Sequence, residues 1–261
     1  SQFLSSLLLC SPMADGDTKI TVNNLNEQPY VEMTLWWLNK QGIRYENSGL
    51  DYFEIPGRQK YTAFHEPISA DFSSATFFLC AAAITDSELT LQGLDMEDPQ
   101  GDKRVIHVLK DMGARIDINP EGITVRGGKL KGMEVDMNDI PDALPSMAVV
   151  GCVAEGKTVI RNVPQARLKE TDRIAVMARE LRKMGAKIEE LPDGMVIHQS
   201  RLTGADVDSH HDHRVVMSLT VAGMVAKGAT TVNSAEAMEV TFPNFAQLMR
   251  LAGARLTLLE S

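Results

Sequence analysis

LRKMGAKIE, residues 181–189, ends a helical pattern with a glycine and passes directly into a strand pattern. Three other segments repeat this pattern: LNKQGIRYE (38–46), LKDMGARID (109–117) and LMRLAGARLT (248–257). Intervals of 71, 72 and 68 residues separate the shared glycines, which are Gly42, Gly113, Gly185 and Gly253. A period of this length predicts a chain built from equivalent modules.

A second helix pattern lies about half a period from each of these segments, runs apolar and then leads into a strand. The alternation of helices and strands predicts an α/β protein of stacked modules. Cys10, Cys80 and Cys152 occupy matching points of three apolar helices, at intervals of 70 and 72 residues. We therefore expect three reduced, buried core cysteines and neither a disulfide framework nor a zinc site.

The module boundaries follow from the same period. Modules that begin near Ser1, Asp71, Asp142 and His213 leave the fourth module about 22 residues short of the full period. Either this module is capped early or another segment completes it. Pro67, in FHEPISAD, is the best candidate for a domain boundary.

The composition indicates a globular protein and restricts its partners. The net charge is -9 and the apolar content is 44%. Nucleic acids and membrane surfaces require a broad basic field, so we expect neither as a partner. The apolar run SQFLSSLLLC (1–10) has no basic flank and is too short to span a bilayer. The expected location is cytoplasmic.

Polar residues begin each module, directly before an apolar helix. They are Ser1 and Gln2, Asp71, Asp142, and the pair His213 and Arg214. Helix N-termini attract anions, so several of them brought together by the repeat would form an anion site. Each residue alone could instead be a helix cap. For Asp71, which Ser73 and Ser74 follow, we favour the cap.

The segment QARLKETDRI (165–174) holds five charged residues within seven positions. A charge run usually forms a solvated helix face. Lys169 and Arg173, however, are four residues apart and would share a face near a helix N-terminus, where cations oppose the dipole. This placement predicts a compensating phosphate or carboxylate ligand.

The segment DSHHDHR (208–214) resembles a metal site because three histidines and two aspartates precede its arginine. No distant Cys or His motif completes a ligand shell, and Arg214 would repel a cation. We therefore favour a hydrogen-bonding His213 beside an anion-binding Arg214. No metal and no organic cofactor is predicted.

Five motifs occur together in one order: PYVEMT (29–34), IPDALPSMAV (140–149), LKETDR (168–173), DHR (212–214) and TFPNF (241–245). With this combination the chain resembles the 5-enolpyruvylshikimate-3-phosphate synthases along its whole length. The related UDP-N-acetylglucosamine enolpyruvyl transferases share the architecture but lack LKETDR together with DHR.

The resemblance implies the enolpyruvyl transferase fold, in which each of two domains is an inside-out α/β barrel of three βαβαββ units. Residues 1–69 would be the last unit of the upper domain, and residues 70–261 would be most of the second domain. The N-terminal twenty or so residues of the family complete the second domain, which would explain the short fourth module. The chain would thus be the C-terminal portion of an enzyme, inactive alone and able to pair with a separate N-terminal half.

The implied reaction transfers the enolpyruvyl group of phosphoenolpyruvate to the 5-hydroxyl of shikimate 3-phosphate, in the shikimate pathway to chorismate and aromatic amino acids. The resemblance implies three catalytic residues, which are Asp142, Glu170 and His213. It also implies six substrate-binding residues, which are Ser1, Gln2, Tyr30, Lys169, Arg173 and Arg214. Three positions depart from the pattern of the best-known members, and they are Glu27, Gln165 and Val240.

Two other functions stay open from the sequence. The chain could belong to a UDP-N-acetylglucosamine enolpyruvyl transferase, although a reactive loop cysteine would then be expected and all three cysteines are predicted in helices. It could also be a non-catalytic half that binds shikimate 3-phosphate or pairs with another polypeptide.

Overall fold

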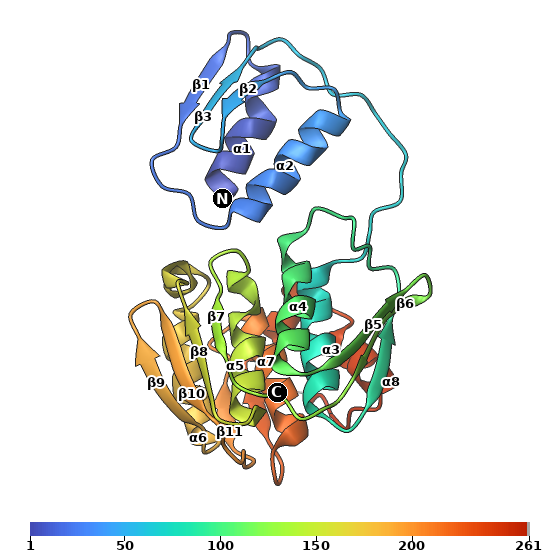
Figure 1. The fold of residues 1–261 in the computed structure, drawn as a ribbon, viewed down its shortest axis with the longest axis vertical. Coiled ribbons are helices and arrows are strands. Elements are labelled where there is room, and N and C mark those ends of the chain that lie inside the picture. Colours follow the sequence, from blue (N-terminus) through green and yellow to red (C-terminus); the bar gives the residue numbers. More distant parts are fainter. Residues whose placement is uncertain (260–261) are drawn as a thin grey trace. The chain divides into compact units, whose positions relative to one another are not determined.

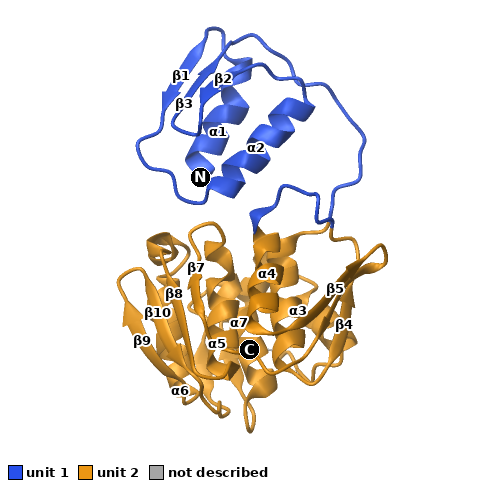
Figure 2. Ribbon diagram, viewed as in Figure 1, with its two compact units in different colours: residues 1–69, 95–101 blue, residues 70–94, 102–261 orange. Residues whose placement is uncertain are grey.

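The chain folds into two compact units, which Figures 1 and 2 distinguish. The computed structural model describes residues 1–259. Unit 1 comprises residues 1–69 and 95–101, and unit 2 comprises residues 70–94 and the chain from residue 102 onward. Within the described residues, no helix has the length and apolar character needed to cross a membrane.

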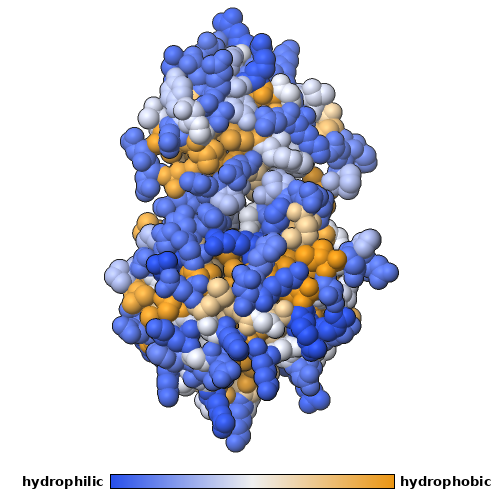
Figure 3. All heavy atoms as spheres, viewed as in Figure 1, coloured by the Kyte–Doolittle hydropathy of each residue, from blue (hydrophilic) through white to orange (hydrophobic). Residues whose placement is uncertain are grey.

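Unit 1 packs two helices against a three-stranded antiparallel sheet of order β1-β3-β2. Its elements are α1 (Gln2–Cys10), η1 (Ser11–Met13), β1 (Thr18–Thr21), α2 (Gln28–Lys40), β2 (Glu46–Ser48) and β3 (Tyr52–Ile55). Leu8, Val31 and Phe53 are completely buried at the centre of its core. Helix α1 is apolar beyond this buried face and exposes Phe3 and Leu7. Figure 3 shows apolar surface on both units.

Unit 2 contains the remaining helices and strands. Its helical elements are α3 (Phe72–Ile84), η2 (Gly101–Lys103, of which Gly101 belongs to unit 1), α4 (Arg104–Met112), η3 (Pro141–Ala143), α5 (Leu144–Val153), η4 (Pro164–Leu168), α6 (Arg173–Lys183), α7 (His213–Val225), η5 (Ala235–Val240) and α8 (Phe245–Leu251). Its strands are β4 (Glu88–Leu91), β5 (Arg115–Asn119), β6 (Gly122–Arg126), β7 (Glu134–Asp136), β8 (Lys157–Arg161), β9 (Lys187–Leu191), β10 (Gly194–His198), β11 (Asp206–Asp208) and β12 (Thr231–Asn233). The predicted α/β class is confirmed.

Unit 2 contains three sheets, with the orders β4-β6-β5, β7-β8-β10-β9 and β11-β12. In the four-stranded sheet, β8 pairs parallel with β7 and antiparallel with β10. The parallel pair of β11 and β12 repeats the first half of this arrangement. Within the described residues, the sheet of β11 and β12 lacks the antiparallel hairpin that β9 and β10 form in the four-stranded sheet.

The core of unit 2 is formed by α3, α5 and α7, which contact one another. Helix α5 is buried on nearly every side, as expected for a helix without a polar face. The hydroxyls of Ser146 on α5 and Ser218 on α7 lie 3.0 Å apart in this buried interior. The two serines are separated by 72 residues, so this contact joins corresponding positions of two modules.

The repeated glycines end the amphipathic helices α2, α4, α6 and α8, as the sequence predicts. Their φ angles are 67° at Gly42, 109° at Gly113, 90° at Gly185 and 98° at Gly253. A left-handed residue after a helix redirects the chain, and glycine adopts this conformation without steric cost. The period found in the sequence therefore corresponds to a repeated helix termination.

The cysteine prediction is correct for two residues and wrong for the third. Cys80 and Cys152 are buried, and burial raises both thiol pKa values, that of Cys152 to about 12. Cys10 is exposed because it ends α1, whose sides are only partly covered. All three cysteines are free.

Candidate active site

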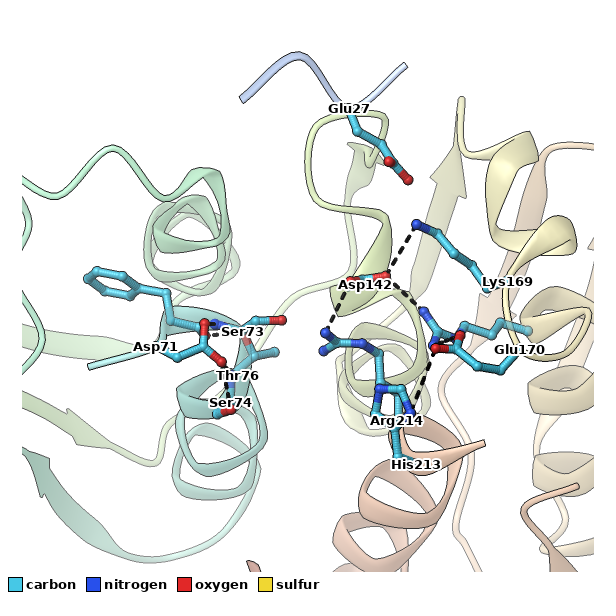
Figure 4. A network of polar contacts seen from close by, with 12 residues as sticks. Glu27, Asp71, Ser73, Ser74, Thr76, Asp142, Lys169, Glu170, His213 and Arg214 are labelled. Carbon is cyan, nitrogen blue, oxygen red and sulfur yellow. Dashed lines mark hydrogen bonds and ion pairs between the residues drawn. The ribbon is translucent and has the colours of Figure 1, made fainter. Parts of the chain in front are cut away.

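A cluster of charged side chains in unit 2 forms where η3, the segment before α6 and the start of α7 meet (Figure 4). Three cations and three carboxylates contribute to it. They are Asp142, Lys169, Glu170, Arg173, Asp212 and Arg214. The structure therefore brings together the residues that the sequence assigned to this unit, although up to 72 residues separate them in the chain.

Arg173 is the centre of the cluster, and its side chain is only 1% exposed. Its guanidinium donates to Asp212 through Nε at 2.8 Å, to Asp142 through Nη1 at 2.8 Å and to Glu170 through Nη2 at 2.5 Å. Burial disfavours the guanidinium charge, but Asp212 and Asp142 outweigh it and raise the pKa of Arg173. A buried arginine needs such carboxylates because an unpaired buried charge is strongly destabilising.

Asp142 faces three cations. Its carboxylate lies 2.8 Å from Arg173 Nη1, 3.0 Å from Arg214 Nη2 and 3.7 Å from Lys169 Nζ. Figure 4 shows Lys169 and Arg214 directed toward it. Burial would raise the pKa of Asp142, but Arg214, Arg173 and Lys169 together lower it. The carboxylate is thus ionised at neutral pH and 17% exposed, and the three cations that lower its pKa also weaken it as a base.

His213 and Glu170 form a second contact at the edge of the cluster. The Nδ1 atom of His213 lies 3.8 Å from a carboxylate oxygen of Glu170. Burial and the neighbouring Arg214 charge lower the pKa of His213, so the ring is neutral at neutral pH. A neutral imidazole offers both a donor and an acceptor nitrogen. At 3.8 Å the two groups make no direct hydrogen bond, and each is of a type that can exchange protons.

The predicted helical face with Lys169 and Arg173 is wrong. Asp172 caps α6 by accepting from the Ala175 N–H, so the helix begins at Arg173 and Lys169 lies before it. The cations near this N-terminus are compensated by the carboxylates of the chain itself. Their presence therefore does not by itself require a bound anion.

Asp212 is the main residue of the cluster that the sequence analysis missed. It is completely buried, and it accepts from Arg173 and from the Arg214 N–H at 2.9 Å. As the N-cap of α7 it corresponds to Asp71, whose carboxylate accepts from the N–H groups of Ser73 and Ser74 as predicted. An aspartate before an apolar helix was the signal that could have identified it.

The predicted module-starting positions differ in detail from the observed helix starts. His213 is the first residue of α7 and follows the cap, and Asp142 lies inside η3, two residues before α5. Neither residue caps its helix. Both side chains belong to the charged cluster, where Asp142 contacts Arg173 and His213 lies near Glu170.

The histidines of the segment 208–214 contact three different carboxylates. His210 Nε2 lies 3.3 Å from Glu180, His211 Nδ1 lies 3.4 Å from Glu236, and His213 contacts Glu170. Consistent with this divergence, residues 1–259 contain no group of three or more His, Cys, Asp or Glu side chains arranged to hold a metal ion.

Unit 1 contains the other predicted site residues. Ser1 Oγ donates to Glu27 at 2.6 Å, Gln2 begins α1 and is exposed, and Tyr30 lies in the first turn of α2. Glu27 precedes α2 with a left-handed φ of 61°. The assignment of Ser1, Gln2 and Tyr30 to a ligand remains a prediction.

The two other departures from the family pattern have different surroundings. Gln165 donates from Nε2 to the Asn138 carbonyl at 3.0 Å, while its buried Oε1 accepts no hydrogen bond. Val240 ends η5 and is 80% exposed, so an apolar residue there contributes little to the core.

Glu180, on α6, is expected to stabilise the fold in a pH-dependent way. Burial would raise its pKa, but donors including Lys183 and the Asp208 N–H lower it to about 2. The contribution of Glu180 to the free energy of unfolding is about 3 kcal/mol in total. It is complete above about pH 4.5 and is lost as the pH falls through the pKa of Glu180 in the folded state. Urea unfolding should therefore show that Glu180→Gln destabilises the chain more at neutral pH than at about pH 3.

The matched control is Glu134→Gln, which removes a carboxylate that pairs with Arg161 on the surface, where both side chains are about half exposed. Exposed pairs contribute only about 0–1 kcal/mol. An equal effect of the two substitutions at every pH would contradict the assignment of a special role to the buried carboxylate.

Comparison with known proteins identifies relatives of this chain. The sequence model described as EPSP synthase (3-phosphoshikimate 1-carboxyvinyltransferase) matches residues 1–249. A 3-phosphoshikimate 1-carboxyvinyltransferase of Ruminiclostridium cellulolyticum is 54% identical over 99% of this chain and 61% of its own length. The enzyme of that name from Methanocaldococcus jannaschii is 42% identical over 98% of this chain and 60% of its own length.

A solved structure supports the same relationship. An EPSP synthase from Acinetobacter baumannii matches with a TM-score of 0.81 and 30% identity, covering 97% of this chain and 60% of that one. The chain thus spans about three-fifths of the length of the relatives that it matches.

Proposed function

This chain belongs to the EPSP synthase family, and from that premise we propose that it supplies the C-terminal part of a 3-phosphoshikimate 1-carboxyvinyltransferase. The complete enzyme, meaning this chain together with the remaining two-fifths of the family's length, would transfer the enolpyruvyl group of phosphoenolpyruvate to the 5-hydroxyl of shikimate 3-phosphate. This reaction belongs to the shikimate pathway, and we propose a cytoplasmic location for it.

The observation that carries the proposal is the charged cluster of unit 2. Asp142, Arg173 and Arg214 come from three separate elements, and Asp142 is in direct contact with both arginines. Arginine suits the carboxylate and phosphate of phosphoenolpyruvate because its fork geometry binds such groups in bidentate fashion. We assign Lys169, Arg173 and Arg214 to substrate binding in this unit.

The reaction requires proton transfers at two places. The methylene carbon of phosphoenolpyruvate gains a proton, the hydroxyl oxygen adds to the adjacent carbon and loses its proton, and phosphate leaves as the methyl group returns a proton. We assign Asp142, Glu170 and His213 to these proton movements. The ionised Asp142 and the neutral His213 have suitable protonation states at neutral pH.

We assign Ser1, Gln2 and Tyr30 of unit 1 to shikimate 3-phosphate, on the strength of the motifs alone. We also propose that residues 1–69 are the last repeat unit of an upper domain and residues 70–261 most of a second domain. Each complete domain would be an inside-out α/β barrel of βαβαββ units. Support comes from the repeated helix terminations and from the module-to-module contact of Ser146 with Ser218.

The segment that completes the second domain has a candidate location. A cavity of about 910 Å³ in unit 2 is lined by α3, β4, α7, β12 and α8. It lies beside the two-stranded sheet that lacks a hairpin within the described residues. We propose that a segment from the N-terminal part of the complete enzyme fills it, whether in one polypeptide or as a separate half.

Ligand binding tests the proposal directly. Calorimetric titration of the chain with shikimate 3-phosphate, with and without the remaining part, separates the enzyme from a non-catalytic half that binds this ligand unaided. Binding of a uridine nucleotide sugar in place of shikimate 3-phosphate would favour the second enolpyruvyl transferase family. Binding of neither ligand by the complete enzyme would contradict the proposed function.

Arg214→Ala in the complete enzyme is expected to weaken phosphoenolpyruvate binding by about 10- to 100-fold, because it removes a charge-assisted contact of roughly 1.5 to 3 kcal/mol. Affinity is measured by titration in the presence of shikimate 3-phosphate. Arg161→Ala is the control, since that arginine pairs with Glu134 on the surface. An unchanged phosphoenolpyruvate affinity would remove Arg214 from the site.

A further inference from the structure

Glu180 is a completely buried carboxylate that lies outside the charged cluster. Arg179 Nε donates to it at 2.9 Å, Lys183 Nζ lies 2.6 Å away, and the Asp208 N–H donates at 3.0 Å. His210 Nε2 is 3.3 Å from the same carboxylate. A buried charge with this many donors is retained at a particular position, because any displacement would leave it without partners.

Glu180 and Arg173 occupy the same face of α6. They are seven residues apart, which is close to two helical turns, and both side chains are almost fully buried. Arg173 binds Asp212, whereas Glu180 binds the backbone of Asp208. One helix face therefore holds both ends of the turn formed by residues 208–212.

The turn between these two attachments has an unfavourable backbone conformation. His210 and His211 have φ angles of 53° and 59°, in the left-handed region that non-glycine residues seldom adopt. Such residues persist only where the surrounding structure fixes them. Inside the turn, the His210 N–H donates to Asp208 Oδ1 at 2.6 Å and the Asp212 N–H donates to the Ser209 carbonyl at 3.1 Å.

The turn leads directly into the site. Asp212 accepts from the Arg214 N–H and binds Arg173, and His213 and Arg214 follow at the start of α7. A shift of the turn would move all of these groups together. Without Glu180, α6 would hold the Asp208 end of the turn only through the contact of Arg179 with His210, beside the pairing of Asp208 with Asn233 of β12.

We infer that Glu180 is a positioning residue, which holds the 208–212 turn so that His213 and Arg214 are aligned for phosphoenolpyruvate. This inference rests on the proposed function for its ligand. The attachment itself is a property of unit 2 and can be measured without turnover.

The first test uses steady-state kinetics of the complete enzyme. Glu180→Ala is expected to raise the KM for phosphoenolpyruvate by about tenfold or more, because an alanine cannot hold the turn, while the KM for shikimate 3-phosphate changes less than about twofold. Glu180→Gln should recover much of the loss, since its side-chain oxygen still accepts from the Asp208 N–H. Glu134→Gln should behave as the parent does.

The second test is amide hydrogen exchange of the chain, which needs no substrate. In Glu180→Gln and Glu180→Ala, the N–H groups of Asp208, Arg214 and Val215 should exchange faster, most in the alanine variant, and by a larger factor than the amides of α3 and α5, whose exchange changes only with the global stability. An increase of the same factor throughout unit 2, or a rise of both KM values together, would indicate only a general loss of stability and overturn the inference. Exchange and kinetics identical to the parent would overturn it as well.

The two arms separate the inference from the proposed function. A parent enzyme that does not turn over these substrates would contradict the function, and the exchange rates of residues 208–215 would then decide alone whether Glu180 holds the turn. If Glu180→Ala does not fold, Glu180→Gln supplies both measurements, because it preserves the shape of the side chain.

Discussion

Asp142→Asn in the complete enzyme is expected to lower turnover by about 10²- to 10⁴-fold, the range that general acid–base groups supply. The substitution preserves the size of the side chain but removes the carboxylate that Arg173, Arg214 and Lys169 keep ionised. An amide cannot take the proton of the attacking hydroxyl. The measurement is kcat and KM from phosphate release, with both substrates varied.

The control for this prediction lies three residues away. Asp139 pairs with Arg104 at 3.4 Å, and its side chain is 44% exposed, so Asp139→Asn removes an aspartate without touching the cluster. Urea unfolding of both variants distinguishes lost chemistry from lost stability, because Asp142→Asn also deprives Arg173 of one partner. A large rise in KM with normal kcat would show that Asp142 holds substrate and does not move protons.

Local signals in the sequence account for the parts of the fold that were predicted. Gly113 ends a helix with a left-handed conformation, and that requirement is encoded by the glycine itself. Repetition of this signal at a nearly constant interval was sufficient to reveal the modules. The cap at Asp71 is equally local, since an aspartate and the next three residues determine it.

One error is local, and the others concern contacts between distant segments or surfaces that the sequence does not specify. The start of α6 at Arg173 depends on the cap by Asp172, and mistaking it placed Lys169 on the helix. The partner of Arg173 at Asp212 lies 39 residues away, beyond any helical spacing. Cys10 follows the same pattern as Cys80, yet its exposure is set by how much protein covers α1.

The charged cluster also illustrates what residue types alone cannot determine. Lys169 and Arg173 were selected because cations near a helix N-terminus predict an anion, but the structure pairs each arginine with carboxylates from this chain. Any anion that binds these arginines would have to compete with their internal partners. Glu170 is the most exposed of the three carboxylates, which makes its contact with Arg173 the easiest to exchange for a ligand.

The 261-residue chain by itself is expected to give no measurable phosphate release from phosphoenolpyruvate and shikimate 3-phosphate. Its relatives are longer, and this chain covers about three-fifths of them. Stabilisation of transition-state charge requires preorganised groups, and loss of one such group lowers the rate by about 10²- to 10³-fold. If the remaining two-fifths of the enzyme contribute several such groups, the losses in rate multiply, and the chain alone is far slower than a variant that lacks one group.

Addition of a polypeptide that contains the remaining part should restore phosphate release, provided that it folds onto the chain. The cavity beside β12 is a suitable place for it to bind, because its apolar lining gains stability when covered. When the chain in this mixture carries Asp142→Asn, the recovered rate should be lost. The added polypeptide supplies the missing groups but cannot replace the Asp142 carboxylate. Phosphate release by the purified chain alone, at a rate comparable to the mixture, would show that the site in residues 1–261 is already complete.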